Sequence, residues 1–330
     1  MNDEFYMQLA LNEAWKYQGL TYPNPAVGAV VVQDGKILSI KAHKQAGTSH
    51  AEVLALLSAY ETLTQNTINF DTSDAELSHT FLLNLEKGFF SKCTIYVTLE
   101  PCSHKGKTPS CASLLQTLAL KKVLIGMKDP IVGHDGGADG LTNVSVSLLE
   151  KECQALLEPF MIWQKRAFVL FKLAQTANGR IGGGYLSSKA SLTHVHQLRG
   201  VCDTLLIGGN TVRVDRPTLD CRFTGARAPQ VCIYSKEDSF DRKIPLFSVV
   251  NREVSVTNDL NFLDKPSFVL VEGGEGMLNA LKEKIDWMLL YQTPKLTTNT
   301  LTYNTTMNLA FLHSDKKDID LMIWSKNLGD

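Results

Sequence analysis

Short apolar runs typical of β-strands alternate with helical segments along this chain, and the alternation occurs in two separate series. The first series reaches from "AVGAVVVQDGKILSI" (26–40) to "KKVLIGM" (121–127). The second begins at "AFVLFKLA" (167–174) and continues to "DWMLLYQTPKL" (286–296). Strands that alternate with helices predict an α/β fold, and a length of 330 residues favours two domains over one. We therefore expect a chain of two α/β domains.

The expected boundary between the domains is a helical segment near the middle of the chain. We place the first domain at 1–150, a linker helix at 151–165 with a break near Pro159, and the second domain at 166–330. The tail at 313–327 is expected to return as a last strand.

Local signals place several turns and caps in the first domain. Asp34 and Gly35 between two β-rich runs predict a hairpin. Ser49 is expected to cap a helix, with Glu52 three residues later completing a capping box. Residues 60–92 show little periodicity, and we interpret them as a helix end followed by a surface insertion.

Composition and charge exclude some classes of function. The net charge of −1 lacks the basic excess typical of nucleic-acid binding proteins, so no nucleic-acid partner is expected. No apolar run approaches the length of about 18 residues that a membrane span needs. The acidic, interrupted N-terminal sequence does not resemble a signal peptide, so we expect a cytoplasmic protein. Seven irregularly spaced cysteines favour reduced thiols, some of them metal ligands.

Four residues form a pattern typical of a catalytic zinc site. His50 and Glu52 stand at the start of a helix, Cys102 follows a strand, and Cys111 starts the next helix. One imidazole and two thiolates suit zinc and leave its fourth position open for water. Glu52 is then free to carry protons as a general acid and base. The order H-x-E, then P-C, then C is that of the zinc nucleobase deaminases.

The wide spacing of Cys102 and Cys111 narrows the class of deaminase that the sequence predicts. With "NPAVG" upstream, the motif "TLEPCSHKGKTPSC" closely resembles the deaminase domain of the bifunctional riboflavin-biosynthesis deaminase/reductase family. The resemblance implies a cytidine-deaminase-like three-layer α/β/α sandwich. It also implies one Zn²⁺ on His50, Cys102 and Cys111, with Glu52 as the proton donor. The substrate and its phosphate would be held by Asn24, His43, His104 and Lys107.

The second domain carries two glycine-rich turns between a strand and a helix. "FVLVEGGEGML" includes Gly273, Gly274 and Gly276, and "LLIGGNTVRVD" precedes it in the chain. Backbone amides at such turns can bind phosphate, although neither turn is a G-x-G-x-x-G or P-loop motif. A nucleotide in another binding mode is the resulting prediction.

The family resemblance extends to this second domain. It implies a dihydrofolate-reductase-like α/β fold that uses NADPH. The NADPH site would be lined by Ala174, Tyr185, Thr211, Asp215 and Gly274, and the substrate would face Arg199, Leu219, Arg222 and Glu272. The chain departs from the family pattern at Asn178 (usually an acid), Tyr185 (usually tryptophan) and Arg216 (usually aspartate).

The predicted function is therefore bifunctional. Zinc-dependent deamination of a phosphoribosylamino-diaminopyrimidinone would be followed by NADPH reduction of its ribosyl group to ribityl. The substrate is a small phosphorylated pyrimidine, and the oligomeric state is left open, a homo-oligomer included. One alternative is a tRNA or nucleotide deaminase with a degenerate second domain. Another is a structural zinc module, which requires a fourth protein ligand such as His43 or His104.

Overall fold

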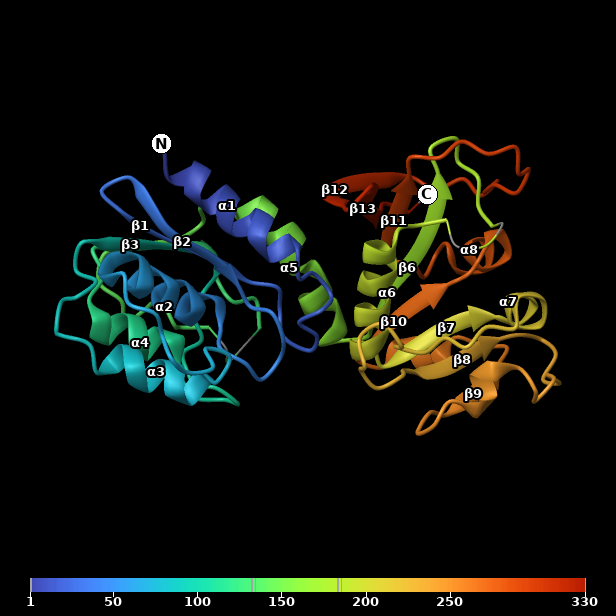
Figure 1. The fold of residues 1–330 in the computed structure, drawn as a ribbon, viewed down its shortest axis with the longest axis horizontal. Coiled ribbons are helices and arrows are strands. Elements are labelled where there is room, and N and C mark those ends of the chain that lie inside the picture. The colour runs from blue at the N-terminus through green and yellow to red at the C-terminus, as the bar shows by residue number, and fades with distance from the viewer. Residues whose placement is uncertain (1, 132, 134, 183, 185, 330) are drawn as a thin grey trace. The chain divides into compact units, whose positions relative to one another are not determined.

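The computed structural model describes residues 2–131, 133, 135–182, 184 and 186–329. The chain divides into two units, residues 1–161 and 162–330, each with its own β-sheet (Figure 1).

Valine-rich strands build the sheet of the first unit. Its described strands are β1 (Gly28–Gln33), β2 (Lys36–Ala42), β3 (Cys93–Leu99), β4 (Lys122–Met127) and β5 (Val144–Ser145). They form one sheet in the order β2-β1-β3-β4-β5. β1 is antiparallel to β2 and β3, whereas β3, β4 and β5 run parallel. β1 and β3 are buried along almost their whole length, as strands covered on both faces must be.

The hairpin that the sequence predicts is present between β1 and β2. Asp34 and Gly35 both have positive φ angles, of 50° and 80°. Two such residues match a two-residue turn to the twist of the flanking strands, which explains the Asp-Gly pair.

Helices cover both faces of this sheet. They are α1 (Asp3–Trp15), α2 (Ala51–Thr64), α3 (Ala75–Leu83), α4 (Cys111–Leu118) and α5 (Glu150–Trp163). Figure 1 shows α2, α3 and α4 grouped on one side of the sheet, and α1 beside the first part of α5 on the other. This arrangement confirms the expected three-layer sandwich.

Two local predictions in the first unit are wrong. His50, not Ser49, is the residue before α2, and the Ser49 hydroxyl instead donates to Ser78 Oγ at 3.2 Å. The insertion at 60–92 is not only a surface excursion, because it contains α3 with a buried face.

The break expected near Pro159 is also absent, since α5 continues through this residue. Buried apolar side chains on both sides of Pro159 hold the helix against its neighbours, and such packing can offset the hydrogen bond that proline cannot donate. They are Cys153, Leu156, Leu157, Phe160 and Trp163.

The second unit is built on a larger mixed sheet. Its strands are β6 (Ala167–Thr176), β7 (Thr204–Gly208), β8 (Gln230–Tyr234), β9 (Val254–Thr257), β10 (Ser267–Glu272), β11 (Trp287–Thr293), β12 (Leu309–Lys317) and β13 (Asp320–Asn327). Their order is β12-β13-β11-β6-β10-β7-β8-β9, parallel from β11 to β9. The tail expected as a single strand is a hairpin, because β12 and β13 pair antiparallel.

Helices and 3₁₀ turns connect these strands. They are α6 (Lys189–Val201), α7 (Gly209–Asp215), α8 (Glu275–Leu281), η1 (Pro245–Ser248) and η2 (Asn261–Asp264). The core between sheet and helices is made of apolar side chains such as Phe171, Leu206, Val269 and Leu281. Across the described part of the chain, none of the helices combines the length and apolar character needed to cross a bilayer.

Candidate active sites

Two helix starts and the end of one strand bring together the predicted metal ligands. His50 directly precedes α2, Cys102 lies three residues beyond the end of β3, and Cys111 is the first residue of α4. Because β3 lies between β1 and β4, its carboxyl end is close to the starts of the helices that follow β2 and β3. The sheet topology thus brings together three residues that are up to 61 positions apart.

The separations between these side chains fit a metal centre. His50 Nδ1 lies 3.4 Å from Cys111 Sγ and 3.8 Å from Cys102 Sγ. Ligands at about 2.0–2.3 Å from a tetrahedral zinc ion are about 3.3–3.8 Å apart. Among the described residues, these three are the one group of at least three His, Cys, Asp or Glu side chains whose ligand atoms all lie within 4.8 Å of one another. A zinc ion therefore fits, with room for one further ligand.

The electrostatics of the two cysteines differ. Hydrogen bonding from Cys111 lowers the pKa of the Cys102 thiol to about 4, against the effect of burial and with help from His50. The bond to Cys102 and complete burial raise the pKa of Cys111 well above its usual value. Cys102 is therefore a thiolate at neutral pH, and metal binding would release the Cys111 proton.

Glu52 lies next to these ligands with its side chain buried. It is 4% exposed, and it shares a hydrogen bond with the Cys111 thiol. Burial raises the pKa of the Glu52 carboxyl, and the neighbouring His50 only partly opposes this effect. A carboxyl group with a raised pKa beside a metal site is suited to accept and return protons.

The buried His43 and the half-buried Asn24 form a pair beside His50. His43 Nδ1 lies 3.2 Å from the Ser49 carbonyl oxygen, to which it can donate, and Asn24 Nδ2 lies 3.1 Å from His43 Nε2. Burial, with His50 close by, lowers the pKa of His43 to about 4, so its ring is neutral. Both ring nitrogens of His43 are engaged, which counts against this residue as a fourth zinc ligand.

The remaining predicted residues of this site lie on the loop between the two cysteines. His104 and Lys107 are exposed on this loop. In the metal trio of His50, Cys102 and Cys111, by contrast, Cys111 is buried and the other two residues are half-buried. Lys105 between them pairs with Glu76 of α3 at 2.8 Å, so the inserted helix reaches the same loop.

Two residues near the metal trio escaped the sequence analysis. Thr108 Oγ1 lies 3.1 Å from His50 Nε2 and can fix the ring orientation. Glu100 is buried and accepts from the backbone N–H groups of Asp129 and Ala138, at 3.0 and 2.8 Å. It ties the end of β3 to the segment after β4. Its place just before Pro101 and Cys102 was the available signal.

In the second unit, the carboxyl ends of parallel strands border a cavity of about 1460 Å³. Ligands in open α/β sheets bind at this edge. Sites for one small molecule measure about 300–1,000 Å³, so this cavity has room for a cofactor and a substrate. The described predicted residues that line it are Ala174, Arg199, Thr211, Asp215, Leu219, Arg222, Glu272 and Gly274. Tyr185 lies outside the described residues.

A charge cluster that is largely shielded from solvent lies at the wall of this cavity. Arg199 Nε donates to Glu272 Oε1 at 2.6 Å, and Lys172 Nζ lies 3.3 Å from Glu272 Oε2. Although burial works in the other direction, the two cations hold the pKa of Glu272 well below its usual value. The sequence analysis did not name Lys172, although it lies two positions before Ala174 on β6. Side chains two positions apart on a strand lie on the same face, so Ala174 was the available signal.

The glycines of the two turns serve different purposes. At Gly209 an added Cβ would lie 2.6 Å from Ser235 Oγ, so this glycine permits close packing of α7 on the turn after β8. At Gly274 it would meet no atom within 4 Å, so the backbone there is open to the cavity. A nicotinamide dinucleotide therefore fits along this edge, where Ser235 is a further lining residue.

Two departures from the family pattern have structural partners. Asn178 accepts from Thr176 Oγ1 at 2.7 Å and donates to the Thr297 carbonyl oxygen at 2.9 Å, which ties two loops together. Arg216 pairs with Asp241 at 2.6 Å.

Comparison with known proteins agrees with both halves of this arrangement. Residues 1–127 match the cytidine and deoxycytidylate deaminase zinc-binding region, and residues 167–303 match the RibD C-terminal domain. The riboflavin biosynthesis protein RibD of Aquifex aeolicus is 34% identical over 86% of this chain and 72% of its own length. RibD of Escherichia coli is 30% identical over 76% of this chain and 67% of its own length.

Solved structures show the same fold. A Thermotoga maritima structure is described as a diaminohydroxyphosphoribosylaminopyrimidine deaminase/5-amino-6-(5-phosphoribosylamino)uracil reductase. It superposes with a TM-score of 0.67 at 26% identity, over 98% of each chain. Acinetobacter baumannii RibD has a TM-score of 0.64 at 23% identity over the same shares, which supports the fold alone. The matched domains point to zinc and a nicotinamide cofactor. The chain therefore belongs to the RibD family of riboflavin biosynthesis proteins, with a zinc deaminase domain followed by a reductase domain.

Proposed function

We propose that the first unit deaminates 2,5-diamino-6-(5-phosphoribosylamino)pyrimidin-4-one and that the second reduces the product with NADPH. In the first reaction water replaces the amino group at C2, and ammonia leaves. In the second, C1′ of the ribosyl group receives a hydride, the C1′–O4′ bond of the ring breaks and O4′ takes a proton, which gives an open ribityl chain. The description of the Thermotoga maritima relative supports this pair of substrates.

The residues of the first unit divide the work of deamination. His50, Cys102 and Cys111 would hold zinc, which when bound supplies a Lewis acid that activates water at neutral pH. Glu52 would take a proton from the attacking water and return it to the departing amino group. Its buried carboxyl, with a raised pKa, suits both transfers.

Substrate recognition in this unit would rest on two separate groups. Asn24 donates to His43, so its amide is held in one orientation and its oxygen is left to accept from the pyrimidine. His104 and Lys107 lie on the exposed loop and would hold the phosphate, which a flexible ammonium group suits.

In the second unit the cavity would place cofactor and substrate side by side. Ala174, Thr211, Asp215 and Gly274 would contact NADPH, which when bound supplies the hydride, and Tyr185 stays a prediction from the sequence. Arg199, Leu219, Arg222 and Glu272 would face the sugar phosphate. The close pairing of Lys172, Arg199 and Glu272 supports a site for a polar ligand beside the cofactor.

The observation that carries this proposal is the convergence of His50, Cys102 and Cys111 beside the buried carboxyl of Glu52. It is tested with Glu52→Gln, which keeps the shape of the side chain but cannot accept a proton. We expect this variant to retain zinc, measured by elemental analysis, and to lose ammonia release by at least about a hundredfold.

Glu86→Gln, at an exposed position of the same unit, is the matched control and should release ammonia at the wild-type rate. Full turnover by the Glu52 variant would falsify the assigned role of this carboxyl. Addition of NADPH to the wild-type reaction should then give NADPH oxidation that depends on prior ammonia release.

The remaining sequence predictions concern the setting of the enzyme. We keep a cytoplasmic location and the absence of a nucleic-acid partner as parts of the proposal, and homo-oligomerisation stays open to a light-scattering measurement. Tight, salt-sensitive binding of tRNA would instead favour the tRNA deaminase alternative.

A further inference from the structure

The loop at 217–222 follows α7 and forms part of the wall of the large cavity, to which it contributes Leu219 and Arg222. Leu219 has a φ angle of 56°, in the left-handed region that leucine rarely adopts. A leucine keeps this conformation only where its surroundings impose it. The contacts around the loop identify what imposes it here.

Arg252, just before β9, binds the backbone on both sides of Leu219. Its guanidinium donates to the carbonyl oxygens of Leu219 at 2.7 Å and Thr218 at 2.8 Å, and also to that of Leu246 in η1. The Thr218 and Leu219 carbonyls belong to the two peptide planes that flank the Leu219 Cα. Because one rigid guanidinium holds both planes, it determines φ and ψ of Leu219 together.

The next carbonyl of the loop binds a different arginine. The Asp220 carbonyl oxygen accepts from Arg199 Nη1 at 3.3 Å, and Arg199 also pairs with Glu272 in the cavity wall. The Asp220 carboxylate accepts from Arg222 Nε at 2.7 Å. The left-handed turn at Leu219 thus lets successive carbonyls reach Arg252 and then Arg199.

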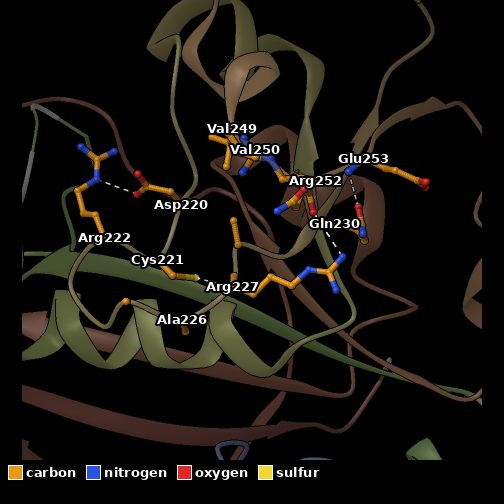
Figure 2. A pocket seen from close by; sticks show the side chains of 13 residues that line it. Asp220, Cys221, Arg222, Ala226, Arg227, Gln230, Val249, Val250, Arg252 and Glu253 are labelled. Atoms are coloured by element: carbon orange, nitrogen blue, oxygen red, sulfur yellow. Dashed lines mark hydrogen bonds and ion pairs between the residues drawn. The ribbon is translucent and has the colours of Figure 1, made fainter.

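Arg252 itself lines a neighbouring, shallow pocket, which shares Arg222 with the large cavity. Figure 2 shows Arg252 among the lining side chains of this pocket, together with the Arg222–Asp220 pair. Arg252 is not among the residues that line the large cavity, and its bonds go to the backbone of the loop instead.

We propose that Arg252 is a positioning residue for the reductase substrate, because it holds the 217–222 loop in the conformation that presents Leu219 and Arg222 to the cavity. The proposal rests on the proposed reductase function. It concerns the substrate, because Leu219 and Arg222 are the predicted substrate residues of this loop. The described residues predicted to contact NADPH lie outside 217–222, at Ala174, Thr211, Asp215 and Gly274.

The test compares Arg252→Met with Arg227→Met. Arg227 lines the same shallow pocket, is exposed, and makes one long bond, of 3.4 Å, to the Asn251 carbonyl oxygen. In Arg252→Met we expect the KM for the deaminated pyrimidine to rise about tenfold, with the Kd for NADPH nearly unchanged. Added guanidinium ion should restore part of the loss. Arg227→Met should behave as the wild type.

A second readout does not depend on activity. Hydrogen exchange of the backbone amides at 218–222 should become faster in Arg252→Met and not in Arg227→Met. Unchanged exchange and unchanged KM would overturn the proposal, and so would a parallel loss of NADPH binding, which indicates general unfolding of the unit.

If Arg252→Met does not fold, Arg252→Lys serves instead. Its ammonium cannot bind the three carbonyls in one plane, so the KM should still rise, by about threefold. An unchanged KM in Arg252→Lys would refute the positioning role. The wild-type protein could show slow hydrogen exchange at 218–222 and still not oxidise NADPH with this substrate. That result would refute the proposed reductase function and the substrate part of this inference.

Discussion

The Thr108 hydroxyl shows how one side chain outside the predicted ligand set can control a metal site. It lies 3.1 Å from His50 Nε2, while His50 Nδ1 faces the two cysteine sulfurs. A histidine that binds metal through one nitrogen needs a partner on the other, because this partner sets both tautomer and ring orientation. Thr108 is buried on an otherwise exposed loop, as this role requires.

Thr108→Val removes this hydroxyl with little change in shape. We expect the affinity for zinc to fall about tenfold or more, measured by competition with a chelator of known affinity. Thr117→Val, at an exposed position of α4, is the matched control and should bind zinc like the wild type. Equal affinities in the two variants would show that Thr108 does not orient His50.

The inserted segment at 60–92 packs against the rest of the first unit through α3. Aromatic contacts join α2 to α3 and the segments beside it, with ring centroids 5.0 Å apart for Tyr60 and Phe81, and 5.4 Å for Phe70 and Phe81. The Ser49 amide also donates to the Ser73 carbonyl oxygen at 3.0 Å. The insertion therefore packs against the residue next to His50 and belongs to the fold of this unit.

Two leucines of α3 test this conclusion. Leu82 is fully buried, whereas Leu77 is 51% exposed. We expect Leu82→Ala to reduce the free energy of unfolding of the first unit by about 2–5 kcal/mol, since it leaves a cavity. Leu77→Ala should change it by less than about 0.5 kcal/mol. Urea titrations of both variants make the comparison, and equal small effects would mean that α3 is loosely attached.

At the scale of the whole molecule, both units bury neutral histidines. Burial lowers the pKa of His43 to about 4 and that of His194 to about 3. In the unfolded chain a histidine has a pKa of about 6.5. As the pH falls from about 6.5 towards 3, the unfolded state takes up protons that the folded state does not, so stability is lost in this window.

His194 carries the clearest part of this dependence, since it is 1% exposed and its Nδ1 lies 2.5 Å from the Tyr291 hydroxyl. When the pH falls from 7.5 to 5, protonation of His194 in the unfolded state should lower the free energy of unfolding of the second unit by about 2 kcal/mol. In His194→Gln, urea titrations across this range should show a correspondingly weaker pH dependence. The exposed His104→Gln is the control, and an unchanged slope in His194→Gln would contradict the assignment.

Several features of the fold and the site could be predicted because they depend on residues close together in the chain. The alternation of strands and helices indicated two α/β domains, the Asp34-Gly35 pair indicated the hairpin, and the order of His50, Glu52 and the cysteines indicated the deaminase chemistry. The first two signals are local, because side-chain period and turn geometry follow from the chain within a few residues. The third combines two short motifs, one at 50–52 and one at 98–111.

Contacts between residues far apart in the chain became known from the three-dimensional fold. It showed that α5 passes through Pro159, that α3 packs beside the metal trio, and that Arg252 holds the turn at Leu219. Such outcomes depend on strand order and on packing that offsets a local cost. The partners of Lys172, Thr108 and Arg252 are far away in the chain. The sequence around each of these residues was therefore not enough to assign it a role.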